Sequence, residues 1–172
     1  GVECVYGDTD SVFLRLKGVT SVEAASKEAV RLAGIVDAVI PSPNRLEFEK
    51  VYYPMLLRGK KRYAGMKFDE GESPATLDVK GLEMQRRDNF PLLPSVQRGA
   101  ILKIMDMDPS GADELVRSEL ERILTQDPRT LDLSQFTIAK ELTKPTGSYA
   151  TPPPHVKVAI DMESRGVAVR TR

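Results

Sequence analysis

Two carboxylates near the amino end of the chain have the spacing of a metal site. Asp8 and Asp10 lie two residues apart in the run Tyr6-Gly7-Asp8-Thr9-Asp10-Ser11. Close carboxylates repel each other, so they usually share a proton or a cation. Mg²⁺ favours one or two carboxylates together with waters and phosphate oxygens. The pair therefore indicates a magnesium site for phosphoryl transfer, although Asp and Gly are also common in ordinary hairpin turns.

The residues around this pair predict a β-hairpin. Residues 2–6 and 11–17 are rich in β-branched and aromatic side chains, and four residues separate them. We expect Gly7 to supply the unusual backbone angle of the turn. Alternate residues of an extended segment project to one side, so Asp8 and Asp10 can approach a common point. Thr9 and Ser11 are expected to shape the turn.

A second cluster is strongly basic. Arg58-Gly59-Lys60-Lys61-Arg62-Tyr63 carries four positive charges in six residues. We expect a hairpin with its turn at Arg58-Gly59, in which Lys61 and Tyr63 share one face and Lys60 and Arg62 share the other. Cations beside an aromatic ring suit a phosphate backbone and a groove. The alternative is a solvated hairpin edge on which lysines prevent aggregation.

Together these motifs resemble family B (α-like) DNA polymerases. The stretch Glu47-Phe48-Glu49-Lys50 … Tyr53-Pro54 … Lys60-Lys61-Arg62-Tyr63-Ala64-Gly65 is similar to the family's palm segment that follows an Asp-Thr-Asp turn. The resemblance implies two Mg²⁺ ions, with Asp10 as a ligand of both and Asp8 as a ligand directly or through water. Two such ions, about 3.5–4 Å apart, stabilise the attacking and leaving oxygens of an in-line displacement.

The resemblance also assigns nucleic-acid contacts in this part of the chain. It implies that Lys61 and Tyr63 contact the primer–template duplex, with Lys60 and Arg62 in support, and that Thr9 and Ser11 lie at the nucleic-acid contact. Glu47 and Glu49 share a face of an expected strand over 45–51 and could add an outer acidic shell to the metals. Solvent-facing charges are the alternative for these two glutamates.

Two later segments extend the likeness. Gly81-Leu82-Glu83 … Arg86-Arg87-Asp88 … Pro91 is similar to the palm-to-thumb junction, where Arg86 and Arg87 contact phosphate or, as we prefer, form ion pairs with Glu83 or Asp88. Residues 140–166 resemble the thumb segment that cradles the product duplex. The implied contacts there are Lys140, Lys144, Tyr149 and His155. No functional residue is assigned between 92 and 132.

The histidine and cysteine content limits other chemistry. His155 is the only histidine and Cys4 the only cysteine, so a zinc site is improbable, and we interpret His155 as a hydrogen-bonding or helix-start residue. One cysteine excludes an internal disulfide and fits a reducing, intracellular compartment. That compartment would be the nucleus in a eukaryote and the cytoplasm in a prokaryotic or viral system. Cys4 itself is expected to be a buried small hydrophobe.

The bulk composition is that of an ordinary globular protein. The chain has 172 residues, 41% hydrophobic and 29% charged, and no net charge. A nucleic-acid binder of this kind needs its positive charge clustered rather than in excess. No apolar run approaches the ~18 residues that span a bilayer, so we expect no membrane association.

The hydrophobic periodicity predicts an α+β fold. We expect antiparallel palm hairpins with one packed helix over residues 1–90, followed over 91–172 by a mainly helical thumb that is truncated at its C-terminal end. The other expected elements are a helix over 20–40 with a capping box of Thr20 and Glu23, a loop over 69–74, a helix around 96–104, another from 110 with Asp113 in capping position, a strand over 135–142, and a helix over 155–164 that ends at Gly166.

The resemblance implies template-directed addition of deoxynucleotides to a primer 3′ end. The family's other metal motif, its fingers helix that holds the deoxynucleoside triphosphate, and its proofreading exonuclease do not occur in this sequence. We therefore expect the missing N-terminal palm, fingers and exonuclease portion to be supplied in cis or in trans, and the chain alone to be inactive. The first residues already form an expected strand, which suggests part of a longer protein or one piece of a split one.

Three alternatives remain open at this point. The chain could be a non-catalytic duplex DNA-binding module that keeps the acidic motif as a relic. It could be the small subunit of a naturally split polymerase. A different magnesium-dependent phosphotransferase would need a phosphate-cradling loop such as Gly-x-x-x-x-Gly-Lys-Ser, and none occurs.

Overall fold

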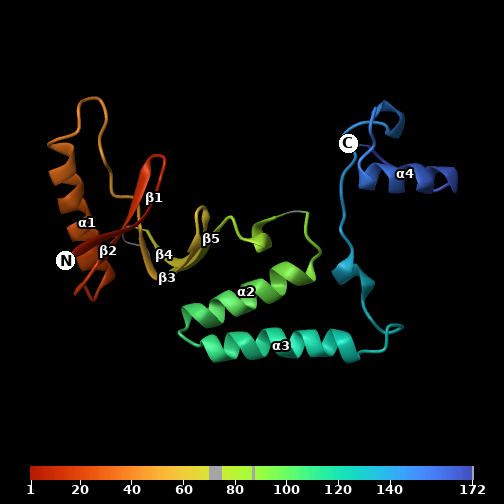
Figure 1. The fold of residues 1–172 in the computed structure, drawn as a ribbon, viewed down its shortest axis with the longest axis horizontal. Coiled ribbons are helices and arrows are strands. Elements are labelled where there is room, and N and C mark those ends of the chain that lie inside the picture. The colour runs from red at the N-terminus through yellow and green to blue at the C-terminus, as the bar shows by residue number, and fades with distance from the viewer. Residues whose placement is uncertain (70–74, 87, 172) are drawn as a thin grey trace.

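The computed structural model describes residues 1–69, 75–86 and 88–171. Its fold is α+β, as the sequence predicts, and its elements follow one another along an elongated molecule (Figure 1). A two-stranded sheet is followed by a three-stranded sheet, and both are antiparallel. The elements are β1 (Val2–Asp8), β2 (Ser11–Leu16), α1 (Val22–Asp37), β3 (Val51–Gly59), β4 (Arg62–Phe68), β5 (Thr76–Lys80), α2 (Leu92–Met105), α3 (Pro109–Thr125) and α4 (Pro154–Ser164).

The predicted acidic hairpin is present, but its turn is tighter than expected. β1 pairs with β2 up to Asp8 opposite Ser11, which leaves only Thr9 and Asp10 in the turn. The left-handed backbone angle falls on Thr9, with φ of 48°, and the expectation for Gly7 is therefore wrong. Because the ladder continues through Gly7, that residue is extended and the chain reverses two residues later. Asp10 thus lies in the turn itself and not in an extended strand.

The basic hairpin is also present with a later turn. β3 extends through Gly59, which pairs with Arg62, so the turn is Lys60-Lys61 and not Arg58-Gly59. Lys61 takes a left-handed conformation with φ of 58°. Gly81, with φ of +63°, packs so closely on this turn that an added Cβ would lie 1.9 Å from the Lys61 carbonyl oxygen. Only glycine fits at that position.

The predicted strand over residues 45–51 is wrong up to residue 50. Regular strand structure begins at Val51, which pairs with Phe68 at the far end of β4. The preceding residues have no ladder partner among the described residues, and alternation alone cannot make a strand without a neighbouring strand. By contrast, β5 was not predicted, although Leu77 and Val79 alternate with polar residues.

The helices form where periodicity predicts them, but their caps differ. The Ser21 side chain accepts a hydrogen bond from the Ala24 N–H, so Ser21 and not Thr20 caps α1. Asp108 and not Asp113 caps α3, accepting from the Gly111 N–H at 2.8 Å. In both cases the better cap is the residue directly before the first helical turn.

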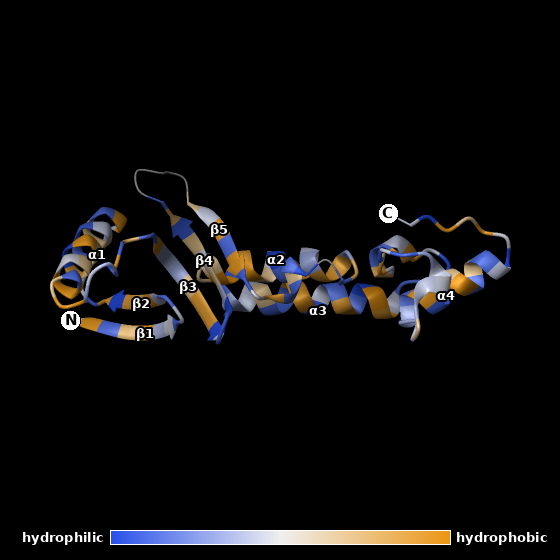
Figure 2. Cartoon of the chain, turned by 90° about the horizontal axis from the view of Figure 1, so that it is seen from above, coloured by the Kyte–Doolittle hydropathy of each residue, from blue (hydrophilic) through white to orange (hydrophobic). Residues whose placement is uncertain are grey.

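Two separate groups of buried side chains hold the chain together. The larger core consists of Ala64, Val79, Ile101 and Met105, and it packs the β3–β5 sheet against α2. This core contains residues from both sides of position 90. It therefore does not separate the two domains that we expect to meet there, and that boundary stays a prediction. The smaller core consists of Leu142, Val156 and Ala159 near α4. Figure 2 shows hydrophobic residues distributed along the whole length of the molecule.

The strand predicted over residues 135–142, between α3 and α4, does not form. Residues 135–142 form part of a short 3₁₀ turn, Leu133–Phe136, and then an irregular stretch with one isolated bridge between Leu142 and Thr171. The predicted last helix is confirmed as α4, and Gly166 follows its end with φ of +78°. Within the described ranges, no helix combines the length and the apolar character that crossing a lipid bilayer requires.

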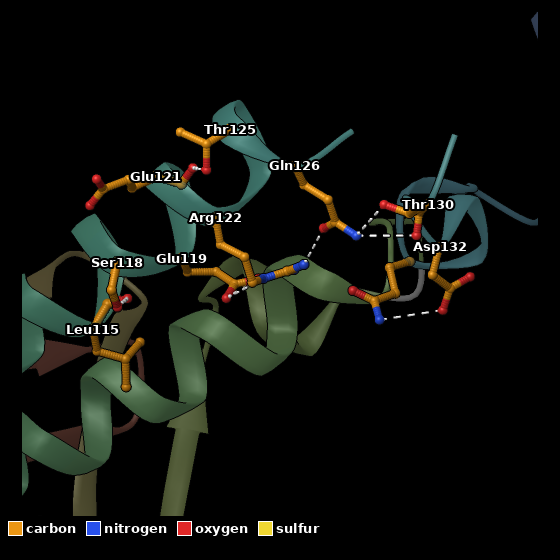
Figure 3. Close-up of polar contacts among 10 residues, drawn as sticks. Leu115, Ser118, Glu119, Glu121, Arg122, Thr125, Gln126, Thr130 and Asp132 are labelled. Carbon is orange, nitrogen blue, oxygen red and sulfur yellow. Dashed lines mark hydrogen bonds and ion pairs between the residues drawn. The ribbon is translucent and has the colours of Figure 1, made fainter. Parts of the chain in front are cut away.

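A polar network closes the C-terminal end of α3 (Figure 3). Arg122 pairs with Glu119 and also donates to the Gln126 side-chain oxygen at 2.8 Å. Gln126 in turn donates to the Thr130 carbonyl at 3.1 Å. These bonds tie the loop after α3 to the helix end.

Candidate functional site

The acidic hairpin tip is bound to the basic hairpin tip through Asp8. The Lys61 ammonium lies 2.9 Å from one Asp8 carboxylate oxygen and 2.8 Å from the other. Tyr6 and Thr9 hydroxyls each donate to the same carboxylate at 3.2 Å. Asp10 is exposed and makes no side-chain hydrogen bond or ion pair within the described ranges, although its charge acts on Lys61. One carboxylate of the pair is thus neutralised and the other is open.

This ion pair changes the protonation behaviour of both partners. The hydrogen bond from Lys61 holds the pKa of the Asp8 carboxyl below its usual value. The same bond raises the pKa of the Lys61 ammonium. Both groups therefore remain charged at neutral pH. Because the Lys61 side chain is 72% exposed, the pair adds little to folding stability.

A cluster of four aromatic rings joins the two sheets behind these tips. Phe13 lies 5.3 Å from Tyr63, 5.4 Å from Tyr6 and 6.1 Å from Tyr52, measured between ring centroids. These spacings suit edge-to-face and offset contacts. The Tyr6 hydroxyl also accepts a hydrogen bond from the Lys61 backbone N–H at 2.8 Å. The cluster therefore fixes the β1–β2 hairpin against the β3–β4 hairpin.

Most of this cluster was not identified from the sequence as part of the site. Only Tyr63 was assigned a role there, and its ring points into the cluster with Tyr6, Phe13 and Tyr52. A usable signal existed for Tyr6 and Phe13, because both lie in the expected strands of the acidic hairpin, whereas Tyr52 follows the expected strand over 45–51. The contact between hairpins more than fifty residues apart was beyond any local pattern.

A partly buried polar contact supports the cluster from β5. The Tyr52 hydroxyl donates to the Asp78 carboxylate, and Lys80 also pairs with Asp78 at 3.4 Å. Burial and the Asp78 hydrogen bond raise the pKa of Tyr52. Burial opposes ionisation of Asp78, but the Tyr52 hydrogen bond and the Lys80 charge outweigh it and lower the pKa of that carboxyl. Tyr52 therefore remains a neutral donor.

The other cations of the basic hairpin are exposed. Lys60 and Arg62 form no side-chain ion pair with any described residue. Arg58 and Arg62 help to line an open hollow of about 250 Å³, together with Leu56, Gln97 and Ile101. The predicted alternation of faces holds only from Arg62 onwards, because Lys60 and Lys61 lie in the turn.

Glu47 and Glu49 lie outside regular structure. Glu47 pairs with Arg45 at 3.0 Å and Glu49 with Lys50 at 2.6 Å. Their side chains are 71% and 73% exposed. Within the described residues, neither glutamate contacts Asp8 or Asp10, so a role in an outer metal shell stays a prediction.

The predicted junction residues fall into a local ion-pair group. Arg86 pairs with Asp88 at 2.9 Å and with Glu83 at 3.5 Å. The Arg86 hydrogen bond lowers the pKa of Asp88 to about 2, with a smaller contribution from the charge of Lys140. Arg87 lies outside the described residues. The structure thus places Arg86 in the ion pair that we preferred from the sequence.

The predicted contacts of the C-terminal segment lie apart from the acidic tip. Figure 1 places α4 at the opposite end of the molecule from β1. Tyr149 is half-buried against the smaller core, and its hydroxyl lies 3.3 Å from that of Thr143. His155 lies in the first turn of α4, and Lys144 is exposed. The four residues assigned here therefore do not join the Asp8 site directly.

Cys4 differs from its expected environment. It is exposed on β1, and its thiol lies 3.7 Å from the Tyr6 carbonyl oxygen. The expectation of a buried residue is wrong because β1 pairs with β2 alone among the described strands, and Val2, Val12 and Leu14 are also partly exposed.

The comparison with known proteins identifies the family. The family model for DNA polymerase family B matches residues 1–171. The chain belongs to DNA polymerase family B. It is 43% identical over 163 residues to the DNA polymerase delta catalytic subunits of Mesocricetus auratus and Bos taurus, and 38% identical over 162 residues to that of Drosophila melanogaster. Each match covers 94% of this chain but only 14% of the relative, so the chain spans about one seventh of these polymerases' length.

The donor set of this family B chain fits a divalent cation only in part. Two carboxylates at an exposed turn match what Mg²⁺ prefers, and Asp8 already holds a cationic group on both oxygens. In the parts of the chain that the structure describes, no three His, Cys, Asp or Glu side chains are grouped to hold a metal. Asp8 and Asp10 can thus contribute ligands, and the remaining ligands must come from water, substrate or further protein.

Proposed function

We propose that this chain is the C-terminal palm and the thumb of a DNA-directed DNA polymerase. The observation that carries the proposal is the contact between Asp8 and Lys61, which brings the acidic motif and the Lys-Lys-Arg-Tyr motif of family B to one place. We assign residues 1–90 to the palm and 91–172 to the thumb. The substrates are primer–template DNA and deoxynucleoside triphosphates, and the animal origin of the relatives above favours the nucleus.

In this proposal Asp10 and Asp8 hold Mg²⁺, and two such ions supply charge stabilisation for the attacking 3′ oxygen and the departing pyrophosphate. Lys60, Lys61 and Arg62 attract the phosphate backbone near the primer end. Tyr63 orients the basic hairpin through the aromatic cluster. The chain acts only with the missing palm, fingers and exonuclease portion, because a single carboxylate pair cannot hold both ions and the nucleotide.

A chimaera tests this proposal. The matching segment of the bovine DNA polymerase delta catalytic subunit would be replaced by this chain, and extension of a labelled primer would be measured. We expect activity from the chimaera and none from the chain alone. Asp8→Asn and Asp10→Asn should each lower the rate at least about a hundredfold, because charge stabilisation by metal ions contributes several kcal/mol.

The matched control is Glu23→Gln on α1, where an exposed glutamate pairs with Lys27. It should leave the rate unchanged. If the aspartate variants extend primers as well as the unaltered chimaera does, the motif is a relic and the chain is a duplex-binding module. Robust extension by the chain alone would also contradict the proposal.

A further inference from the structure

Lys61 holds the position on Asp8 that a metal ion would need. Its ammonium lies within 2.9 Å of both carboxylate oxygens of Asp8. A divalent ion on the same oxygens would come within a few ångströms of that ammonium, and like charges at such a distance repel. Asp8 therefore accommodates one of these two cations at a time.

We propose that Lys61 is an exchangeable counter-cation of the metal site. Its ammonium neutralises Asp8 when no divalent ion is bound, and an ion that binds Asp8 and Asp10 releases it toward the phosphates of a nucleic-acid duplex. The inference rests on the proposed function, because it takes the aspartates as the metal-binding pair. It adds that metal binding and the duplex contact are coupled through one side chain.

The backbone of Lys61 is held so that only its side chain has to move. Its N–H donates to the Tyr6 hydroxyl at 2.8 Å, and its carbonyl packs closely against Gly81. The side chain is 72% exposed, so its release disturbs no buried group. The Tyr6 hydroxyl, 3.2 Å from Asp8, stays on the carboxylate and keeps the two hairpin tips together during the exchange.

The neighbouring cations differ from Lys61 in this respect. Lys60, in the same turn, makes no ion pair with a described residue. It carries the same charge one residue away, and its removal changes the local potential without freeing Asp8. Lys60→Met is therefore the matched control for Lys61→Met.

A metal titration by NMR separates exchange from general electrostatics. Mn²⁺ would be added to the ¹⁵N-labelled 172-residue chain, and broadening of the Gly7, Thr9 and Ser11 amide signals would be followed. We expect Lys61→Met to bind Mn²⁺ about threefold to fivefold more tightly, the range of an exposed ion pair. Lys60→Met should change the affinity by less than about twofold, because an exposed charge farther from the site is screened.

Each outcome of this titration is decisive. Equal tightening in both lysine variants, or none in Lys61→Met, would overturn the exchange. Asp10→Asn should abolish the broadening. If the unaltered chain shows no broadening that depends on Asp10, the metal pair itself is wrong and the proposed function fails with it. The spectra also show whether each variant is folded.

Amine labelling gives an independent reading of the Lys61 side chain. The chain would be treated briefly with an acetylating reagent with and without Mg²⁺ at constant ionic strength, and the acetylation of each lysine would be measured by fragment mass spectrometry. We expect Mg²⁺ to raise labelling of Lys61 about twofold or more, since release from the carboxylate exposes the amine, while Lys60 stays constant. No change at Lys61, together with normal Mn²⁺ broadening, would reject the exchange and leave the metal pair intact.

Discussion

Asp8 and Lys61 are separated by 53 residues in the sequence, and they meet through two hydrogen bonds beside a cluster of four aromatic rings. By contrast, Lys144 and His155 at the other end of the molecule lie on a segment whose core has three buried residues. At the first end, charged side chains are fixed by contacts between distant segments. At the second end, they are carried by local turns and one helix.

The difference matches what each end is proposed to do. Metal ligands need defined positions, because Mg²⁺ tolerates little deviation from octahedral geometry. Attraction to a phosphate backbone is long-ranged and carries no strict orientation, so cations that grip a duplex can be held more loosely. In its proposed role, the C-terminal segment therefore needs less of the long-range contact that holds the acidic tip.

Truncating a buried side chain in each core separately should have the largest effect on the free energy of unfolding. Ile101→Ala removes a side chain that is 4% exposed between the sheet and α2, and it should lower the free energy of unfolding by about 2–5 kcal/mol. Val156→Ala removes two methyl groups from the smaller core and should cost about 2 kcal/mol. Urea unfolding measures the totals, and hydrogen exchange shows where protection is lost.

The pattern of exchange tests whether the two ends are independent. Ile101→Ala should expose amides of β4, β5 and α2 while α4 keeps its protection, and Val156→Ala should do the reverse. If either substitution weakened both regions equally, the two cores would belong to one cooperative unit.

The next effect concerns the glycine beneath the basic turn. Gly81→Ala forces a left-handed backbone on alanine and places a Cβ against the Lys61 carbonyl. We expect a loss of about 2 kcal/mol or more, since the backbone term alone is about 1–2 kcal/mol. The control is Gly147→Ala in the C-terminal segment, where nothing lies within 4 Å of the added carbon. Equal unfolding midpoints for the two variants in urea would mean that the turn does not depend on this close contact.

A smaller effect should follow from removing the hydroxyl that supports the aromatic cluster. Tyr52→Phe removes a hydrogen-bond donor from the partly buried Asp78 carboxylate and should destabilise the chain by about 1–2 kcal/mol. Tyr53→Phe is the control, because that residue is 73% exposed. A loss as large in the control as in Tyr52→Phe, measured by thermal unfolding, would remove the assigned role of the Asp78 contact.

The sequence predicted those features that depend on local patterns and short motifs. Alternation located the acidic and basic hairpins, apolar spacing located the helices, and the motif pair led to the family. It missed by one to five residues where a turn or cap depends on detailed geometry, as at Thr9, Ser21 and Asp108. Such positions are set by which backbone N–H a side chain reaches, and several neighbouring residues compete for it.

Contacts between segments that are distant in the sequence could not be predicted from any local pattern. The alternation of residues 45–50 predicts a strand, but it cannot show that the partner strand β4 ends at Phe68. Similarly, the pairing of Lys61 with Asp8 and the packing of Phe13 on Tyr63 depend on how two hairpins cross. Of the candidate site, residue types were therefore predictable, while their partners required the fold.

The smallest predicted effect tests the connection between the two ends. Hydrogen bonding to Arg86 is the main reason that the pKa of Asp88 falls from its usual 3.8 to about 2, and the Lys140 charge makes a smaller contribution to the same fall. A carboxyl whose pKa falls on folding adds stability above its unfolded pKa, and this stability is lost as the pH falls through about 2. Arg86→Met should return the Asp88 pKa toward 3.8, and Lys140→Met should raise it only slightly.

The measurement is the ¹³C chemical shift of the Asp88 carboxyl, followed between neutral and acidic pH at low salt. Lys140 acts through its charge alone, so its effect decays with distance and with ionic strength. A rise in the Asp88 pKa in Lys140→Met that disappears in high salt would show that the C-terminal segment lies beside the Arg86 ion pair in solution. An unchanged pKa would mean that this segment is not held there, and the looser end of the molecule would then move independently of the end that carries the aspartates.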